Sequence, residues 1–286
     1  MSVVAPRCES LITVERLGPA LGAAVSGVDL NAPVDAATFA AIKDAFHEHL
    51  VLLFRDQWLT PAAQVAFTER FGPVEGHPLK SRRALDEASG VHVLENLPGH
   101  RGGRNDWWHS DISFGAIPPA LSILHARAIP EGGKGDTLFC NMYAAYASLS
   151  PGLRRVLDGL TAVHDARKLI ARNESVENDE QPIALRLPPA EHPAVRTHPE
   201  TGRRALYVND YFTLRFGDMT EAESRPLLEF LIAHATRPEN VYRHRWRKGD
   251  VIMWDNRCTM HYALYDYGPS EVRVMHRTTA AGDCPR

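Results

Sequence analysis

The residues best able to do chemistry are His109 and Asp111, which stand two positions apart in the run WWHSDISF. If this run is extended, side chains at positions i and i+2 point to the same side, so the imidazole and the carboxylate converge on one point. A third ligand is available in His261, at the end of the later run WDNRCTMHY. Two imidazoles and one carboxylate form the ligand set of non-haem Fe(II) oxygenases, which leaves coordination positions open. The three residues therefore form a candidate metal site.

A His-x-Asp spacing is not specific by itself, because such pairs commonly serve as ordinary core or surface residues. The other histidines illustrate the point. His125 and His276 lie in apolar runs, where a hydrogen-bonded core histidine is the expected role. A second group stands beside charges or prolines and is expected at solvated or capping positions: His164, His192, His198, His234 and His244. The octet alone leaves open whether it is a metal site or a polar break in an aromatic core strand.

A second chemical feature is the run VRVMHRTT, in which Arg273 and Arg277 stand four positions apart. On a strand both arginines share one face, with Met275 between them. If that face turns inward, each guanidinium requires an anionic partner, because burying an unpaired charge is costly. Arginine binds carboxylate or sulfonate oxygens in a planar, bidentate geometry. The alternative is that the same face is exposed to solvent, and the run alone leaves both open.

The elements that would position these residues are few helices and several short strands. Helix signals are apolar residues at three- and four-residue spacing, or an N-cap followed by proline. They mark residues 35–50, 60–71, 150–160 and 220–234. The last segment opens with a T-x-x-E capping box but contains Pro226, which predicts a later start or a bend.

The β-rich runs do not alternate regularly with these helices. They are residues 50–54, 121–129, 205–209, 251–255 and 272–279. This order favours a mainly β fold with flanking helices, an antiparallel barrel or sandwich, over a doubly wound parallel sheet. Two polar stretches, residues 77–106 and 165–203, are too long for ordinary connections and are predicted to be lids or binding loops.

Length and composition bound the class of protein. A chain of 286 residues with 44% hydrophobic and 23% charged residues suits a single folded domain over residues 1–286. A net charge of −3 without a basic block gives no indication of nucleic-acid binding. No segment resembles a signal peptide or a membrane span, and the four cysteines are scattered. We therefore expect a cytoplasmic protein with reduced thiols and no membrane partner.

Taken together, His109-x-Asp111, WDNRCTMHY and RVMHRTT resemble the taurine dioxygenase family of Fe(II)- and 2-oxoglutarate-dependent oxygenases, which includes the 2,4-dichlorophenoxyacetate dioxygenases. The resemblance covers nearly the whole chain, through LGAAVSGVDL, VLLFRDQ, AFTERFGPVEGHP, KGDTLFCNMYAAYASL and YRHRW. It implies a double-stranded β-helix, the cupin-like jelly roll, with Fe(II) bound by His109, Asp111 and His261. It also implies 2-oxoglutarate as cosubstrate, with its distal carboxylate held by Arg273 and the Thr137 hydroxyl.

The implied reaction hydroxylates a small anionic organic substrate with dioxygen and releases succinate and carbon dioxide. Arg277 matches the arginine that holds the sulfonate in taurine dioxygenases. His77 and Asn105 match residues around the amine end of taurine, and Phe212 matches an aromatic wall. A taurine-like sulfonate is therefore the expected substrate. The resemblance further implies a homo-oligomer, a dimer or tetramer.

Three positions depart from the taurine enzymes. Lys80 replaces a tyrosine, and Leu169 with Ile170 replaces a Ser-Phe pair. Exchanging a serine hydroxyl for leucine weakens polar recognition and favours a more apolar substrate body. An aryloxyalkanoate or an alkyl sulfate is accordingly the alternative substrate within the family.

Two hypotheses come from other classes of protein. A non-catalytic jelly-roll protein could keep the anion pocket without turnover, although it has no chemical need for all three ligands and both arginines. A zinc hydrolase would require a general base beside the metal and no 2-oxoglutarate. The complete set of residues favours the oxygenase.

Overall fold

The computed structural model describes residues 12–76, 84–85, 88–99, 105–173 and 188–286. The fold is mainly β. The strands are β1 (Thr13–Arg16), β2 (Ala23–Ser26), β3 (Val51–Phe54), β4 (Ala84–Leu85), β5 (Ala88–Asn96), β6 (Leu121–Ala128), β7 (Thr137–Asn141), β8 (Thr161–His164), β9 (Ala190–Pro193), β10 (Val195–Thr197), β11 (Arg204–Leu206), β12 (Thr213–Phe216), β13 (Val241–His244), β14 (Val251–Asp255), β15 (Thr259–Ala263) and β16 (Arg273–Ala280). The helices are α1 (Ala36–His49), α2 (Pro61–Glu69), α3 (Met142–Ala147), α4 (Pro151–Leu157), α5 (Arg167–Asn173), α7 (Glu221–Ala235) and the 3-10 helix η1 (Pro238–Asn240).

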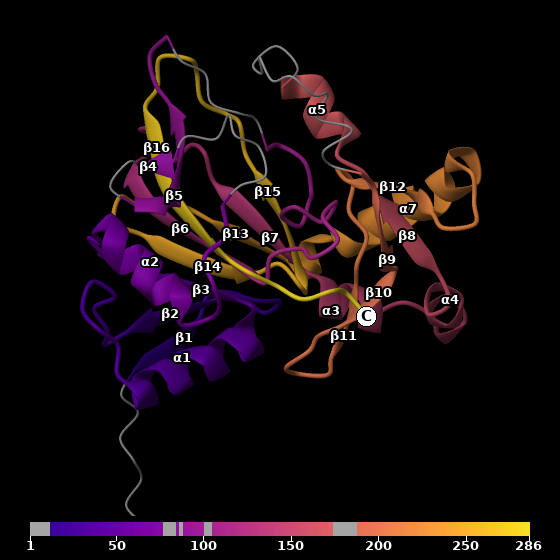
Figure 1. Cartoon of the computed structure of the whole chain (residues 1–286), viewed down its shortest axis with the longest axis horizontal. Coiled ribbons are helices and arrows are strands. Elements are labelled where there is room, and N and C mark those ends of the chain that lie inside the picture. The colour runs from indigo at the N-terminus through magenta and orange to yellow at the C-terminus, as the bar shows by residue number, and fades with distance from the viewer. Residues whose placement is uncertain (1–11, 77–83, 86–87, 100–104, 174–187) are drawn as a thin grey trace, which may run out of the picture.

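Two main sheets carry the fold. Within the described residues, eight strands form the larger sheet in the order β1-β2-β3-β14-β6-β16-β5-β4, and β13-β7-β15 form a second sheet. Figure 1 shows α1 and α2 along one side of the large sheet, and α4, α5 and α7 gathered with β8, β9 and β12 at the other end of the molecule. Among the described strand pairs, only β2 and β3 run parallel. The predicted jelly roll with flanking helices is confirmed.

The alternation of side chains along β14 shows why its sequence, VIMWD, is apolar until its last residue. Val251 and Met253 belong to the core beneath α1 and α2, while Ile252 and Trp254 belong to the core between the two sheets. Across the sheets, the rings of Trp254 and Phe139 lie 5.6 Å apart between centroids. Each such buried side chain contributes about 1.5–3 kcal/mol. A strand covered on both faces has no position for a solvated residue.

The predicted helices form where their caps place them. The Asp35 side chain accepts hydrogen bonds from the first backbone N–H groups of α1, and Thr60 and Ser150 do the same for α2 and α4. The capping box of Thr220 and Glu223 starts α7 at Glu221 with Pro226 inside the helix, so the later start expected from this proline is wrong. No helix in the described part of the chain is both long and apolar enough to cross a membrane.

The two stretches predicted to be long loops contain regular structure. Within residues 77–106, the second half of β5, His92 to Asn96, pairs with β16, and the short β4 pairs with β5. Within residues 165–203 lie α5, β9 and β10. The expectation of continuous loops is therefore wrong, because ASGVHVLEN hides its alternation of buried Val91 and Val93 among polar residues. The lid role stays a prediction.

Several histidines expected in solvated positions are buried. His164, His192, His198 and His244 are at most 2% exposed, so the expectation of a solvated position is wrong for all four. The reason is that each imidazole finds a hydrogen-bond partner inside the fold: His198 Nε2 lies 3.0 Å from Asp255 Oδ2, and His244 Nε2 lies 3.1 Å from Asp250 Oδ2. The capping alternative holds for His198, whose Nδ1 accepts from the backbone N–H groups of Glu200 and Thr201. His125 is buried as expected, with its Nε2 2.9 Å from the Gln57 carbonyl.

Acid should destabilise the protein in part through His125. Burial, with a smaller effect from Arg127, lowers the pKa of His125 to about 4, from an ordinary value of 6.5. Between these values the unfolded state binds more protons than the folded state. The stabilisation is therefore complete above pH 6.5 and is lost as the pH falls towards 4, by up to about 1.4 kcal/mol per pH unit.

Denaturant unfolding at a series of pH values measures this slope. The variant His125→Gln keeps a donor for the Gln57 carbonyl but cannot titrate, so its free energy of unfolding should vary less between pH 6.5 and 4. The same slope in the variant and the wild-type protein would contradict the assignment.

Candidate metal centre and active site

His109 and His261 lie opposite each other in a short antiparallel bridge. The backbone N–H of each donates to the carbonyl of the other, at 3.0 and 2.8 Å. Directly paired residues project to the same face, and the two ring centroids lie 4.1 Å apart. Asp111 follows at the start of a turn, with its Oδ1 3.9 Å from His109 Nε2 and 3.8 Å from His261 Nε2. One ligand atom of each residue lies within 4.8 Å of the others.

Both imidazoles offer a neutral nitrogen to this point. His109 Nδ1 lies 2.7 Å from the Trp107 carbonyl oxygen, so it must donate its proton there, and Nε2 keeps its lone pair. Burial, followed by the neighbouring His109, lowers the pKa of His261 to about 3. At neutral pH the His261 ring is therefore uncharged. Trp254 packs against this ring with centroids 4.9 Å apart.

Asp111 is ionised in this setting. Burial alone would raise the pKa of its carboxyl, but Arg277, the two imidazoles and a hydrogen bond from Ser122 together hold that pKa below its ordinary value. Two neutral imidazoles and one carboxylate, with no thiolate, fit a divalent iron ion better than a softer metal.

Arg277 lies in contact with the metal-ligand candidates. The ladder between β16 and β5 pairs Arg273 with Asn96 and Arg277 with His92 without a break, so the two arginines share one face as predicted. Arg277 is 7% exposed, and its Nη2 lies 2.8 Å from Asp111 Oδ2. The solvent-exposed alternative is wrong for Arg277.

Arg273 is half-buried and stands beside the start of β7. Within the described residues, its guanidinium has no ion pair or hydrogen bond, and it lies 5.9 Å from the centre of the Tyr267 ring. Gly135 has a φ of +74°, and a Cβ there would lie 3.2 Å from Arg273 Nε, so glycine permits the close approach. The buried Thr137 hydroxyl accepts a hydrogen bond from Trp246 Nε1 at 3.0 Å, which leaves its own proton free to donate. Arg273 and Thr137 can thus receive a carboxylate.

The structure places only some of the predicted substrate residues near the metal cluster. Phe212 lies at the metal cluster, its ring centroid 6.1 Å from that of His109. The backbone carbonyl of Asn105 accepts from Ala263 N at 3.2 Å, which places Asn105 beside β15, two residues beyond His261. His77 and Lys80 lie outside the described residues.

An apolar wall joins this side of the cluster. Leu169 and Ile170 of α5 are buried with Phe114, Tyr211 and Phe212. Trp107 packs on the same group and stacks on Tyr211, with ring centroids 4.9 Å apart. Hydrocarbon and aromatic side chains therefore lie on this side of the cluster.

Sequence reasoning missed two polar residues that contact the cluster. The Ser122 hydroxyl donates to Asp111 Oδ2 at 2.7 Å, and Asn256 Nδ2 donates to Ser122 Oγ at 3.1 Å. Asn256 stands in WDNRCTMHY, five residues before His261, and Ser122 is a lone hydroxyl in an apolar strand. Both residues are visible as polar positions in the sequence, but neither position indicates that Asp111 is the hydrogen-bond partner.

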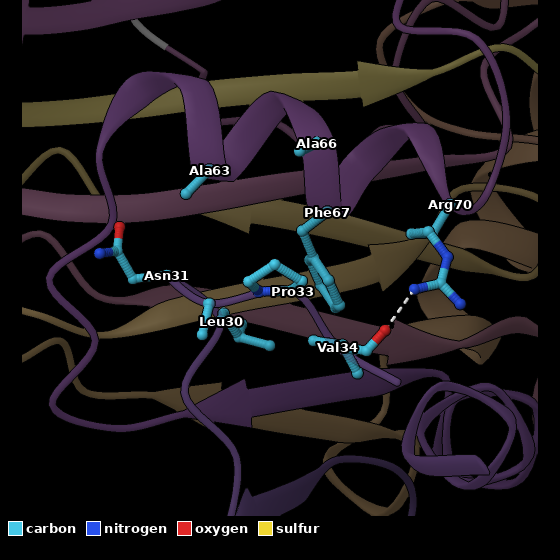
Figure 2. A pocket seen from close by; sticks show the side chains of 9 residues that line it. Leu30, Asn31, Pro33, Val34, Ala63, Ala66, Phe67 and Arg70 are labelled. Carbon is cyan, nitrogen blue, oxygen red and sulfur yellow. Dashed lines mark hydrogen bonds between the residues drawn. The ribbon is translucent and has the colours of Figure 1, made fainter. Parts of the chain in front are cut away.

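A separate pocket of about 250 Å³ lies between α2 and the loop of residues 30–34. Figure 2 shows Phe67 pointing into it and Arg70 closing one end through a hydrogen bond to the Val34 carbonyl, 2.7 Å long. Its lining is largely apolar and shares no residue with the His109, Asp111 and His261 cluster. It offers no metal-ligand set.

The jelly roll brings two imidazoles and one carboxylate close enough together to hold a single metal ion. Comparison with known proteins agrees. A profile of the taurine catabolism dioxygenase TauD, TfdA family matches residues 13–279. The chain is 38% identical to an alpha-ketoglutarate-dependent sulfate ester dioxygenase of Pseudomonas putida, covering 93% of this chain and 88% of the relative.

Two further similar proteins are named for other substrates. The chain is 35% identical to the alpha-ketoglutarate-dependent 2,4-dichlorophenoxyacetate dioxygenase of Cupriavidus pinatubonensis, over 95% of this chain and 98% of the relative. A crystal structure of a putative alpha-ketoglutarate-dependent taurine dioxygenase from Burkholderia xenovorans superposes with a TM-score of 0.82 at 36% identity, covering 96% and 94% of the two chains. The chain belongs to the TauD/TfdA family. It is a 2-oxoglutarate-dependent dioxygenase for a small anionic organic substrate.

Adding Co(II) or Fe(II) to metal-free protein should raise its melting temperature. At a metal concentration of one hundred times the dissociation constant, the expected stabilisation is about 2.7 kcal/mol. His261→Ala should abolish the increase, because two remaining ligands hold a divalent ion poorly. A matched control is His244→Gln, a buried histidine that bonds Asp250, and it should keep the increase. An equal increase in His261→Ala and the wild type would contradict the assigned cluster.

Proposed function

We propose that His109, Asp111 and His261 bind Fe(II), and that Arg273 and Thr137 bind the distal carboxylate of 2-oxoglutarate. The bound iron would supply the activation of dioxygen. The observation that carries the proposal is the direct contact between Arg277 and Asp111, since it places an anion-binding guanidinium beside the metal-ligand set. A substrate anion on Arg277 would hold its neighbouring carbon close to the reacting centre.

The protein's own side chains position the substrate and exclude water from the site. Arg277 orients the substrate anion, and the apolar wall of Leu169, Ile170 and Phe212 covers the substrate body. His109 and Asp111 are themselves 5% and 4% exposed, so the reaction would proceed with little access for bulk water.

For the substrate, we place an alkyl sulfate ester ahead of a taurine-like sulfonate. The apolar wall supports a substrate whose body is hydrocarbon, and one relative, at 38% identity, is named as a sulfate ester dioxygenase. Hydroxylation of the carbon that bears the ester oxygen yields a product that breaks into an aldehyde and sulfate. One atom of dioxygen enters that product and the other enters succinate, with release of carbon dioxide.

Succinate formation tests this proposal directly. Hexyl sulfate should give a kcat/KM at least about tenfold above that of taurine, because the wall rewards apolar contact and offers little to an ammonium group. A 2,4-dichlorophenoxyacetate arm tests the aryloxyalkanoate alternative. Leu169→Ser should lower kcat/KM for hexyl sulfate more than for taurine. A higher kcat/KM for taurine would favour a sulfonate as the substrate over a sulfate ester. Succinate formation without dioxygen would exclude a dioxygenase.

The two arginines should separate the two organic ligands. Arg273→Ala should weaken 2-oxoglutarate binding by about tenfold or more and leave the dissociation constant of the substrate nearly unchanged, because a charge-assisted contact is lost at one ligand only. Arg277→Ala should do the reverse. Anaerobic titration of each ligand, followed by the visible charge-transfer band of Fe(II) with 2-oxoglutarate, measures both constants. Equal losses for both ligands in either variant would contradict the roles.

A further inference from the structure

The Asp111 carboxylate is held by a hydrogen-bond chain whose direction can be worked out from its donors. Trp254 Nε1 lies 2.9 Å from Asn256 Oδ1. An indole N–H can only donate, so the carbonyl end of the Asn256 amide must face Trp254. The same Oδ1 also accepts from the backbone N–H of Asp111, at 3.4 Å. The amide NH₂ of Asn256 consequently faces the other way, towards Ser122.

Ser122 then has only one way to bond. Its Oγ accepts from Asn256 Nδ2 at 3.1 Å and from Arg277 Nη2 at 3.2 Å. A hydroxyl has two acceptor positions and one proton, so both acceptor positions are taken. Its proton must go to Asp111 Oδ2, at 2.7 Å. The indole N–H of Trp254, through the hydrogen bonds of Asn256 and Ser122, thus fixes the direction of the hydrogen bond from Ser122 to the Asp111 carboxylate.

This chain divides the two oxygens of Asp111 between different tasks. Oδ2 receives the Ser122 hydroxyl and Arg277 Nη2. Oδ1 faces the Nε2 atoms of His109 and His261. A single oxygen is therefore presented to the candidate metal position, and the other is reserved for the positively charged side chain that would bind the substrate anion.

The residues of the chain are themselves fixed on rigid elements. Ser122 and Asn256 are 0% and 1% exposed. The backbone N–H of Asn256 donates to the Ala120 carbonyl at 2.9 Å, and the preceding Asp255 accepts two bonds from the Arg257 guanidinium. The turn between β14 and β15 is thus locked on both sides of Asn256, so a change at Asn256 should act on Asp111 and not on the turn.

We infer that Ser122 and Asn256 are positioning residues that fix Asp111 as a one-oxygen metal ligand and hold Arg277 at the same time, with Trp254 setting their orientation. This inference rests on the proposed metal site. Removing the chain frees the carboxylate to rotate and to share Oδ2 with the metal. Metal affinity and substrate affinity should then fall together, while 2-oxoglutarate, bound through Arg273 and Thr137, should be unaffected.

The test uses the full chain and Co(II) titrated into metal-free protein, followed by the visible absorption of bound Co(II). Asn256→Ala and Ser122→Ala should each weaken Co(II) binding by about 10–100-fold, the usual cost of losing a group that orients a metal ligand. Trp254→Phe keeps the ring packing but loses the N–H, and it should give a smaller loss of the same kind. Dissociation constants for 2-oxoglutarate and for the substrate anion are then measured in each variant with Fe(II) at saturation. The first should stay within about twofold, and the second should rise.

Asn240→Ala is the matched control, because Asn240 is also buried and its side chain bonds only the carbonyls of His234 and Ala235 in the described structure. It should lower thermal stability without changing the Co(II) constant. Folded Asn256→Ala and Ser122→Ala proteins that bind Co(II) within about threefold of wild type would overturn the inference. Equal weakening of metal and 2-oxoglutarate binding would overturn it too, as a general loosening of the fold. Failure of the wild-type protein to bind Co(II) would instead refute the proposed function itself.

Discussion

The backbone bridge between His109 and His261 is the constraint on which the rest of the site depends. Because the two residues are directly paired, their imidazoles project to one face, and a slip of one residue would send one of them to the opposite face. The bridge joins β15 to a segment far earlier in the chain, so the site exists only when the fold is complete. Asp111 then needs no strand of its own. It enters the cluster from the following turn, where Ser110 Oγ is tied to the Thr259 carbonyl at 2.7 Å.

The larger sheet supplies the groups that pair with the Asp111 carboxylate. The two histidines approach from β15 and its bridge partner, whereas Ser122 and Arg277 approach from β6 and β16 of the larger sheet. The carboxylate of Asp111 therefore lies between the layers, paired on one side and open on the other. Breaking such a buried pair by removing one partner leaves an uncompensated charge and commonly costs about 3–5 kcal/mol. The site is thus held by the same packing that holds the sheets together.

The sequence predicted the parts of this arrangement that are local or chemically unusual. Apolar spacing placed α1, caps placed α2, α4 and α7, and the His-x-Asp spacing together with His261 identified the cluster that the structure assembles. It failed where partners are distant. The burial of His198 depends on its hydrogen bond to Asp255, and the sequence around His198 does not indicate that this carboxylate is its partner. In the same way, the polar residues of β5 conceal a strand whose position is set by β16, because pairing between strands is not encoded in either strand alone.

Charge balance offers an argument about the substrate that composition could not. Asp111 carries one negative charge, and Arg273 and Arg277 each carry one positive charge. A bound divalent metal and the doubly negative 2-oxoglutarate would cancel each other, which would leave one net positive charge on Asp111, Arg273 and Arg277 taken together. A monoanion such as a sulfate monoester or an aryloxyacetate neutralises it, whereas zwitterionic taurine brings no net charge. Because unbalanced buried charge is costly, this sum favours a singly charged anion with an uncharged body. The same conclusion follows from the hydrocarbon of Leu169 and Ile170, which is a physically separate observation.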